Sequence, residues 1–158
     1  MRRWLKVDPI VAYEFKLVRQ VEFSDTDMAG IMHFTNFFRF MEAAEHAFFR
    51  SLGFSIHTTG FSEPLGWPRV HADCDFKYPL RFEDEVEICL RVREKKAKSL
   101  VYSFTFRKLN EHPVREVARG TLAVACVRRD KSDGKMTGVP IPEAIASKIE
   151  VAPEEVLD

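Results

Sequence analysis

The sequence is poor in glycine, proline and cysteine, and it carries no excess charge of either sign. Its 158 residues include seven glycines and eight prolines, too few for a low-complexity chain. Lysine plus arginine and aspartate plus glutamate each number 24, so we expect no nucleic-acid partner. The longest uncharged apolar stretch near the end, 122–127, is too short to span a bilayer, so we expect no membrane partner.

The three cysteines, Cys74, Cys89 and Cys126, form no CxxC pair and leave an odd count. Such cysteines are typical of reduced core thiols, and we expect a cytoplasmic protein. The first residues, MRRWLKVDP, lack an apolar run, so we expect no secretory signal. The length predicts one domain over 13–150, preceded by an N-terminal arm over 1–12 and followed by a C-terminal tail over 151–158.

Phenylalanine is the abundant aromatic residue, with 14 copies against three tyrosines and two tryptophans. Such apolar rings without a polar tip suit a deep core or an apolar pocket. The longest helical pattern covers 36–52, where apolar residues sweep an arc of about 200° and predict a helix that is wrapped on most sides. Thr35 or Asn36 is expected to cap this helix, and Gly53 to end it.

Alternating apolar residues predict five strands. They cover 13–23, 70–78, 86–92, 102–106 and about 114–128. Short connections at 94–99 and 108–113 predict antiparallel neighbours, and a short helix is expected near 143–150. One apolar helix against one antiparallel sheet is an α+β layout. Such a layout leaves a sheet edge and a face uncovered, which predicts dimerisation.

The loop between the first strand and the helix, 24–36, holds Asp25 and Asp27. The free N–H groups of a helix N-terminus stabilise negative charge that develops on a carbonyl oxygen, and Gly30 lets backbone approach a ligand. A carboxylate beside such a site is a nucleophile or general base for acyl transfer. Two other interpretations stay open: the aspartates form Asx turns, or they hold a metal with His33. Because no second cluster has ligand spacing, we expect no metal.

These residues carry a resemblance to a known family. The segments QV at 20–21, DTDMAGIM at 25–32, NF at 36–37 and ADCDFKYPLRFEDEV at 72–86, together with Glu42, resemble the 4-hydroxybenzoyl-CoA thioesterase family of hotdog-fold proteins. The resemblance implies a five-stranded antiparallel sheet wrapped around one long central helix. It also implies homodimers or dimers of dimers that hydrolyse an acyl-CoA thioester at subunit interfaces. No separate cofactor is implied, because coenzyme A is part of the substrate.

The resemblance also implies roles for individual residues. Asp27 is the expected catalytic carboxylate, and the backbone N–H of Phe34 is expected to polarise the thioester carbonyl. Gly30, His33 and Asn36 are expected beside the substrate, although a purely structural role for His33 stays open. A histidine relay is not carried over, because the subgroup that uses one has its histidine at the Phe34 position. Whether Asp27 attacks the carbonyl or activates water also stays open.

Glu45 lies inside the apolar arc of the helix, where an unpaired carboxylate is costly. It is expected either to pair across a dimer interface, which we favour, or to act as a second catalytic acid beside the substrate. Cations crowd 93–98 and follow the last strand at 128–131. Arg93, Lys95 and Arg128 are candidate ligands for coenzyme A phosphates, against the alternative of solvated turns.

Two other functions compete with thioester hydrolysis. One is a non-catalytic acyl-CoA-binding hotdog protein. The other is a hotdog hydratase or dehydratase, which needs a histidine paired with an acidic residue, and the sequence shows no clear match. The acyl group, and the choice between coenzyme A and a carrier-protein thioester, are left open.

Overall fold

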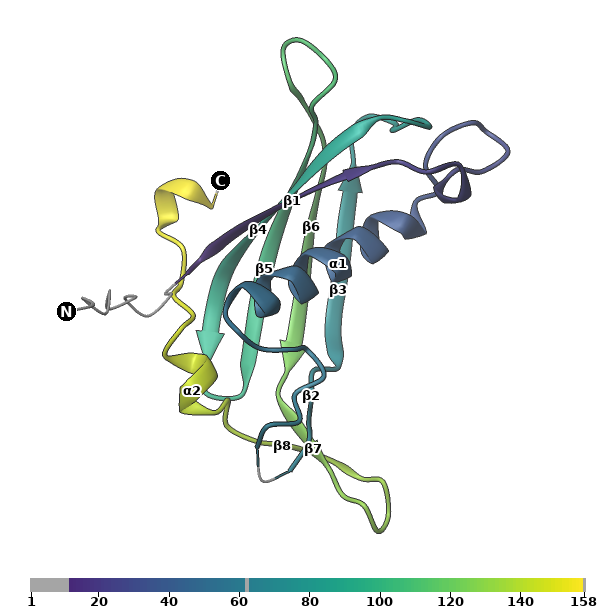
Figure 1. Cartoon of the computed structure of the whole chain (residues 1–158). Coiled ribbons are helices and arrows are strands. Elements are labelled where there is room, and N and C mark those ends of the chain that lie inside the picture. The colour runs from purple at the N-terminus through teal and green to yellow at the C-terminus, as the bar shows by residue number, and fades with distance from the viewer. Residues whose placement is uncertain (1–11, 62, 158) are drawn as a thin grey trace, which may run out of the picture.

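The computed structural model describes residues 12–61 and 63–157, so the expected arm at 1–12, apart from its last residue, lies outside the described residues. One antiparallel sheet has the order β1-β4-β5-β6-β3. Its strands are β1 (Glu14–Gln20), β3 (Arg69–Phe76), β4 (Glu85–Lys96), β5 (Ser99–Lys108) and β6 (Arg115–Ala125). The long helix α1 (Thr35–Ser51) crosses one face of this sheet (Figure 1). The expected α+β hotdog fold is therefore confirmed.

Strand neighbours follow the expected order in only part of the sheet. Strands β4, β5 and β6 pair consecutively as antiparallel hairpins. Strand β3, in contrast, pairs with β6 rather than with β4, and β1 fills the place beside β4. The alternation predicts each strand but not its partner, because hydrogen-bonding groups are the same along every strand.

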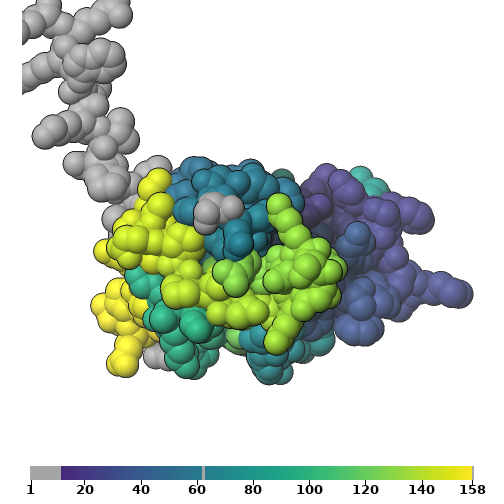
Figure 2. Space-filling model, turned by 90° about the horizontal axis from the view of Figure 1, so that it is seen from below, coloured from purple at the N-terminus to yellow at the C-terminus, as the bar shows by residue number. Residues whose placement is uncertain are grey.

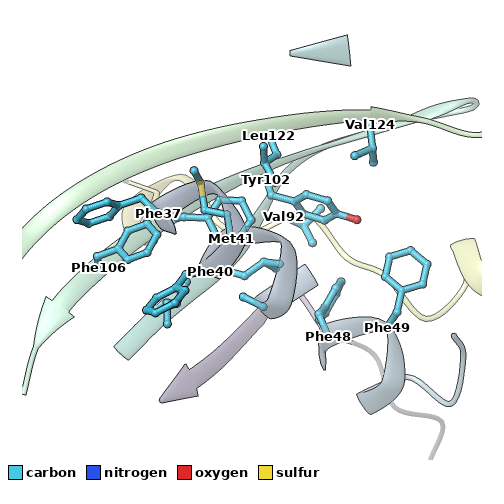
Figure 3. Close-up of a cluster of buried hydrophobic side chains, with 14 of the residues drawn as sticks. Phe37, Phe40, Met41, Phe48, Phe49, Val92, Tyr102, Phe106, Leu122 and Val124 are labelled. Atoms are coloured by element: carbon cyan, nitrogen blue, oxygen red, sulfur yellow. The ribbon is translucent and has the colours of Figure 1, made fainter. Parts of the chain in front are cut away.

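The core lies between α1 and the sheet (Figure 3). Along β5, Leu100, Tyr102, Phe104 and Phe106 face α1 and are at most 1% exposed. Most of α1 is buried against them, as the wide apolar arc predicts. Gly120 of β6 lies under the helix: a Cβ atom there would be 2.6 Å from the Met41 sulfur. Glycine at 120 thus leaves room for the Met41 side chain of α1 against the sheet.

The start of α1 differs from expectation. Its N-cap is Phe34, whose side chain cannot accept a hydrogen bond, so capping by Thr35 or Asn36 is wrong. The ring nitrogen Nδ1 of His33 instead accepts the N–H of Thr35 at 3.3 Å. At the other end, Gly53 has φ +89° after Leu52, as expected for a residue that ends a helix.

Strand β3 does not bury the apolar residues that its alternation places on one face. Val70 is 65% exposed and Phe76 is 48% exposed. This strand is therefore largely exposed within one chain. The reason is its position, because β3 is the last strand of the sheet and has a ladder only to β6 among the described residues.

The far end of the molecule carries a small second sheet that the sequence did not predict. Its order is β2-β7-β8, formed by β2 (Leu65–Gly66), β7 (Val127–Arg129) and β8 (Met136–Gly138). The expected last strand therefore breaks at Cys126 into β6 and β7. These strands have two or three residues, too few to show a period.

The C-terminal residues pack beside β4 and this second sheet. Helix α2 (Glu143–Ala146) confirms the expected short helix, and a 3-10 turn follows at Glu154–Val156. The N–H of Ala152 donates to the Val92 carbonyl at 2.8 Å, within the segment expected as a tail. Figure 2 views this end, where the C-terminal segment (yellow) and the β7–β8 hairpin (light green) form the surface. No helix in the described part of the chain is long and apolar enough to cross a membrane.

Candidate active site

Backbone hydrogen bonds fix the loop that holds Asp27. The Asp27 N–H donates to the Ile31 carbonyl at 3.0 Å, and the Gly30 N–H donates to the Asp27 carbonyl at 2.9 Å. Gly30 has φ +76°, a left-handed conformation that favours glycine. The Met32 N–H donates to the Leu80 carbonyl at 2.7 Å, which ties the loop to the chain before β4. The position of Asp27 is therefore set by the backbone.

The two aspartates of the loop have different tasks. Asp25 is structural: its Oδ2 accepts the Glu22 N–H at 2.9 Å, and its carbonyl accepts the Asn36 side chain at 2.8 Å. Asp27 forms an Asx turn, in which Oδ1 accepts the Ala29 N–H at 2.8 Å. That turn uses one oxygen only, and Oδ2 of the exposed Asp27 has no hydrogen-bond partner among the described residues. One carboxylate oxygen is thus free for chemistry.

A cavity of about 440 Å³ opens beside Asp27. It lies where the loop, the start of α1 and the end of β3 meet, and its wall is mainly apolar and aromatic. The Phe76 ring lies edge-on to Phe37, with 5.0 Å between ring centroids, and to Phe34, with 6.3 Å. The lining residues are Asp27, Ile31, Met32, Phe34, Phe37, Phe76, Lys77, Tyr78 and Pro79.

The backbone at the start of α1 leaves one donor free next to this cavity. The Asn36 N–H donates to the His33 carbonyl, and the Thr35 N–H donates to the His33 ring. The N–H of Phe34 has no acceptor within residues 12–61 and 63–157. Because Phe34 lines the cavity at the positive end of the α1 dipole, its N–H suits a carbonyl oxygen that gains negative charge.

Three of the residues expected beside the substrate support the loop instead of lining the cavity. His33 bonds Thr35 Oγ1 through Nδ1 at 2.7 Å, and its ring lies 4.8 Å from the Phe34 ring. Asn36 is buried and bonds Asp25, while Gly30 shapes the turn. The structural interpretation of His33 is therefore the one that the geometry supports.

Glu45 has a partner in its own chain. Its side chain is 0% exposed, and Oε1 lies 2.7 Å from Nη2 of Arg69 at the start of β3. Burial raises the pKa of Glu45 to about 7, because desolvation outweighs the attraction of Arg69. Glu45 thus has a partner for Oε1 within its own chain, while Oε2 is buried without a hydrogen-bond partner among the described residues, and pairing across a dimer interface stays a prediction. Sequence reasoning missed Arg69, which is 24 residues away and follows no local pattern.

The basic residues proposed for coenzyme A phosphates lie far from Asp27 within one chain. Strand β4 begins at Glu85, beside the loop, and Arg93 and Lys95 lie roughly 25 Å or more along it. Lys95 donates to the Ala146 and Ile149 carbonyls, and Arg128 forms an ion pair with Glu63 at 2.9 Å. Figure 1 shows the Asp27 loop and the β7–β8 hairpin at opposite ends. A single chain therefore does not assemble these cations with Asp27.

Other reactive groups give no second site. Burial raises the pKa of the Cys74 thiol to about 12 and of the Cys126 thiol to about 11, so both are poor nucleophiles. Within the described ranges, no group of three or more histidine, cysteine or acidic side chains could hold a metal ion. The Asp27 cavity therefore stands as the candidate active site.

Several known proteins are similar in sequence to this chain. The 1,4-dihydroxy-2-naphthoyl-CoA hydrolase of Crocosphaera subtropica is 36% identical over 72 residues, 46% of this chain and 53% of that protein. The hydrolase of the same name from Thermosynechococcus vestitus is 27% identical over 140 residues, 89% of this chain and 91% of that protein. This chain spans about half to two thirds of the length of the first curated relatives that it matches.

Solved structures share the fold. A gentisyl-coenzyme A thioesterase superposes with a TM-score of 0.69 at 31% identity, covering 84% of this chain and 99% of that one. The 4-hydroxybenzoyl CoA thioesterase of Pseudomonas sp. strain CBS-3 superposes with a TM-score of 0.72 at 21% identity, covering 85% and 99%, and so shares the fold. A family model matches residues 21–149, which is most of the chain and includes every residue that lines the Asp27 cavity. On these grounds the chain belongs to the thioesterase-like superfamily.

Proposed function

We propose that this protein hydrolyses an acyl-CoA thioester to a carboxylic acid and free coenzyme A. The observation that carries the proposal is one cavity with two free groups: Oδ2 of Asp27 and the backbone N–H of Phe34. The first can act as nucleophile or general base, and the second can donate to the thioester oxygen. The rest of the wall is mainly apolar, which suits an acyl group.

The reaction needs few groups from the protein. The thioester oxygen accepts the Phe34 N–H at the start of α1. Asp27 then either attacks the carbonyl carbon, to give an anhydride that water hydrolyses, or takes a proton from the attacking water. The carbon–sulfur bond breaks in both routes and the sulfur leaves as a thiolate. A thiol has a pKa of about 8.5, so the leaving group needs little help from an acid.

The cavity wall suits an aromatic acyl group. Phe34, Phe37, Phe76 and Tyr78 supply aromatic surface, and ring edges and faces attract one another at such distances. The relatives named above act on dihydroxynaphthoyl, gentisyl and hydroxybenzoyl thioesters of coenzyme A by their names. We therefore place hydroxyaroyl-CoA ahead of aliphatic acyl-CoA as the substrate.

A panel of acyl-CoA thioesters with a thiol reagent tests the function. We expect turnover, fastest with a hydroxyaroyl-CoA, and no release of thiol when the protein is omitted. Tight binding without turnover would identify a non-catalytic acyl-CoA-binding protein. Hydration of an enoyl-CoA would identify a hydratase, but the pair of suitable type, His71 and Asp73 at 2.7 Å, lies exposed on β3 and does not line the cavity.

A further inference from the structure

The face of the sheet that points away from α1 carries a hollow of about 250 Å³. Along β5, Phe104 and Phe106 are buried on the α1 side, so Thr105 between them points to the opposite face. Thr105 pairs with Cys89 of β4, and both residues line the hollow. Because the other lining side chains are longer, these two short ones form its floor.

One cross-strand row of residues runs through this floor. Lys16 of β1 lies opposite Cys89, and Arg119 of β6 lies opposite Thr105. The row therefore places a cation at each end and the two short side chains between them. Its ends are three strand spacings apart, roughly 14 Å. Lysine and arginine side chains are long enough to reach inward from both ends of such a row.

Two further arginines close the other sides of the hollow. Arg91 lies two positions after Cys89 on β4, and Arg107 lies two positions after Thr105 on β5. Because β4 and β5 are antiparallel, the two arginines lie on opposite sides of the row. Four of the seven lining residues are thus cations, and they surround the floor from four directions.

The three arginines are held in place by carboxylates. In each of them Nε donates to a glutamate of the same face: Arg91 to Glu14, Arg107 to Glu87 and Arg119 to Glu116. Among the described residues, the side-chain contacts use at most two of the five N–H donors of each arginine. Nη donors are therefore left for a ligand, on side chains that are already ordered, which lowers the entropy cost of binding.

The single acid of the lining, Glu116, has both oxygens engaged. Oε1 accepts from Arg119, and Oε2 accepts from Lys77. The remaining donors come from several directions, and the hydroxyl of Thr105 adds one from the floor. A phosphate group has oxygens that point in several directions, while the two oxygens of a carboxylate lie in one plane. Phosphate is therefore the anion that fits this arrangement, and arginine is well suited to bind it.

We propose that this hollow binds a small phosphate-bearing anion through Lys16, Arg91, Arg107, Arg119 and the Thr105 hydroxyl. Inorganic phosphates and the terminal phosphates of a nucleotide share this chemistry. The hollow has no lining residue in common with the Asp27 cavity, so it is a separate site. The inference goes beyond the proposed function and does not depend on it.

Titration calorimetry with pyrophosphate, at fixed ionic strength and without divalent cations, tests the site. We expect one pyrophosphate per chain with a Kd below about 1 mM. Arg119→Gln should weaken binding about 10-fold or more, as for the loss of one hydrogen bond to a charged group. The matched control is Arg39→Gln, which removes the same charge from an exposed position on α1 and should keep the wild-type Kd. No binding by wild type, or equal weakening in both variants, overturns the proposal.

A substitution at the floor tests the hollow with all four cations kept. Thr105→Glu places a carboxylate among them, where it should take the place of the ligand and abolish pyrophosphate binding. Thr105→Gln has the same size without the charge, so Thr105→Glu should have the higher thermal midpoint of the two. A lower midpoint for Thr105→Glu, or pyrophosphate binding as tight as in wild type, shows that the hollow does not attract anions and overturns the proposal.

Titrations with inorganic phosphate and ADP identify the source of the phosphate. Tighter binding of ADP than of pyrophosphate, lost in Arg119→Gln, identifies a nucleotide. Equal or weaker binding of ADP identifies an inorganic anion. ADP binding that is unchanged in Arg119→Gln, with no binding of either inorganic anion, places recognition elsewhere and overturns the proposal. Because these experiments use no thioester, they decide the site whether or not the protein proves to be a thioesterase.

Discussion

Asp27 and Glu45 are two carboxylates whose surroundings differ in exposure and in hydrogen bonding. Asp27 is exposed in a backbone-fixed turn, with one oxygen bonded and one free. Glu45 is fully buried on α1 and bonded to a cation. An ionised oxygen that faces a cavity can react with a substrate, while a buried one affects stability and the position of its partner. Exposure and hydrogen bonding, not the presence of a carboxylate, separate the two roles.

The largest effect that we expect is on turnover at Asp27. Asp27→Asn should lower kcat by at least about 100-fold, the low end for loss of a positioned acid–base group. The amide keeps the size of the side chain, and its oxygen can still accept the Ala29 N–H, so the thermal midpoint should change little. Steady-state kinetics on the best thioester and a thermal melt measure both quantities.

Asp25→Asn is the matched control for this comparison. It removes the charge of a carboxylate two residues away, whose Oδ2 accepts the Glu22 N–H in a structural bond, so activity should fall less and stability should fall more than at Asp27. Equal turnover by wild type and Asp27→Asn would remove Asp27 from the mechanism.

The next effect concerns the pH dependence of stability at Glu45. Its pKa is raised from 4.5 to about 7 in the folded chain, so the folded state holds its proton more tightly than the unfolded state. Its contribution to the free energy of unfolding is therefore full below pH 4.5 and falls by up to about 3 kcal/mol as pH rises to about 7. Urea unfolding of wild type and Glu45→Gln at pH 5 and pH 8 measures the difference.

Glu45→Gln has no titrating group at this position, so its stability relative to wild type should be higher at pH 8 than at pH 5. Asp84 and Glu116 have lowered pKa values, so their contributions to stability rise with pH. These contributions are the same in both proteins and cancel in the difference. A difference that does not change between the two pH values would show that Glu45 titrates normally.

The smallest effect is expected at the cations of the far end. If Arg128 and Arg129 hold coenzyme A phosphates at the cavity of a second copy, Arg128→Ala/Arg129→Ala should raise KM about fivefold, roughly 1 kcal/mol, and leave kcat nearly unchanged. The effect should fade as salt rises, because exposed charges are screened over about 8 Å.

For a short thioester without the nucleotide, the KM of this variant should equal the KM of wild type. Arg93→Ala tests the other cluster in the same way, while Lys95 is a poor probe because it binds carbonyls of the C-terminal segment. If KM changes equally for both kinds of thioester, these cations do not bind the phosphates and are solvated side chains.

The sequence predicts the elements of this fold better than their neighbours. Alternation in β5 and the wide arc of α1 are local patterns, and both are present in the structure. The exposed face of β3 was not predicted, because alternation does not say whether a strand is central or at an edge. The small sheet at the far end was missed, since its strands are shorter than the period that would reveal them.

In the candidate site, too, residues within one local motif could be predicted, but contacts between distant segments could not. Asp27 and Phe34 come from one continuous motif and line one cavity. The bond from Glu45 to Arg69 joins residues 24 positions apart and depends on how α1 lies over β3. Lys95 looked free in sequence, but its amine is bonded to carbonyls that only the folded C-terminal segment brings close. Contacts made by folding are beyond a reading of local pattern.

The missing side chain at position 120 has a consequence for how this activity could be tuned. A Cβ atom at 120 would lie 2.6 Å from the Met41 sulfur and 2.9 Å from the Asp73 carbonyl oxygen, so any larger residue there would displace the Met41 side chain of α1 or the backbone of β3. The N–H donor of Phe34 precedes the first turn of α1, and Phe76 at the end of β3 lines the cavity. A methyl group at 120 would thus act on the two elements that flank the cavity without touching the cavity itself. Selection for altered turnover should therefore find variants at 41 and 120, in the middle of the helix–sheet contact.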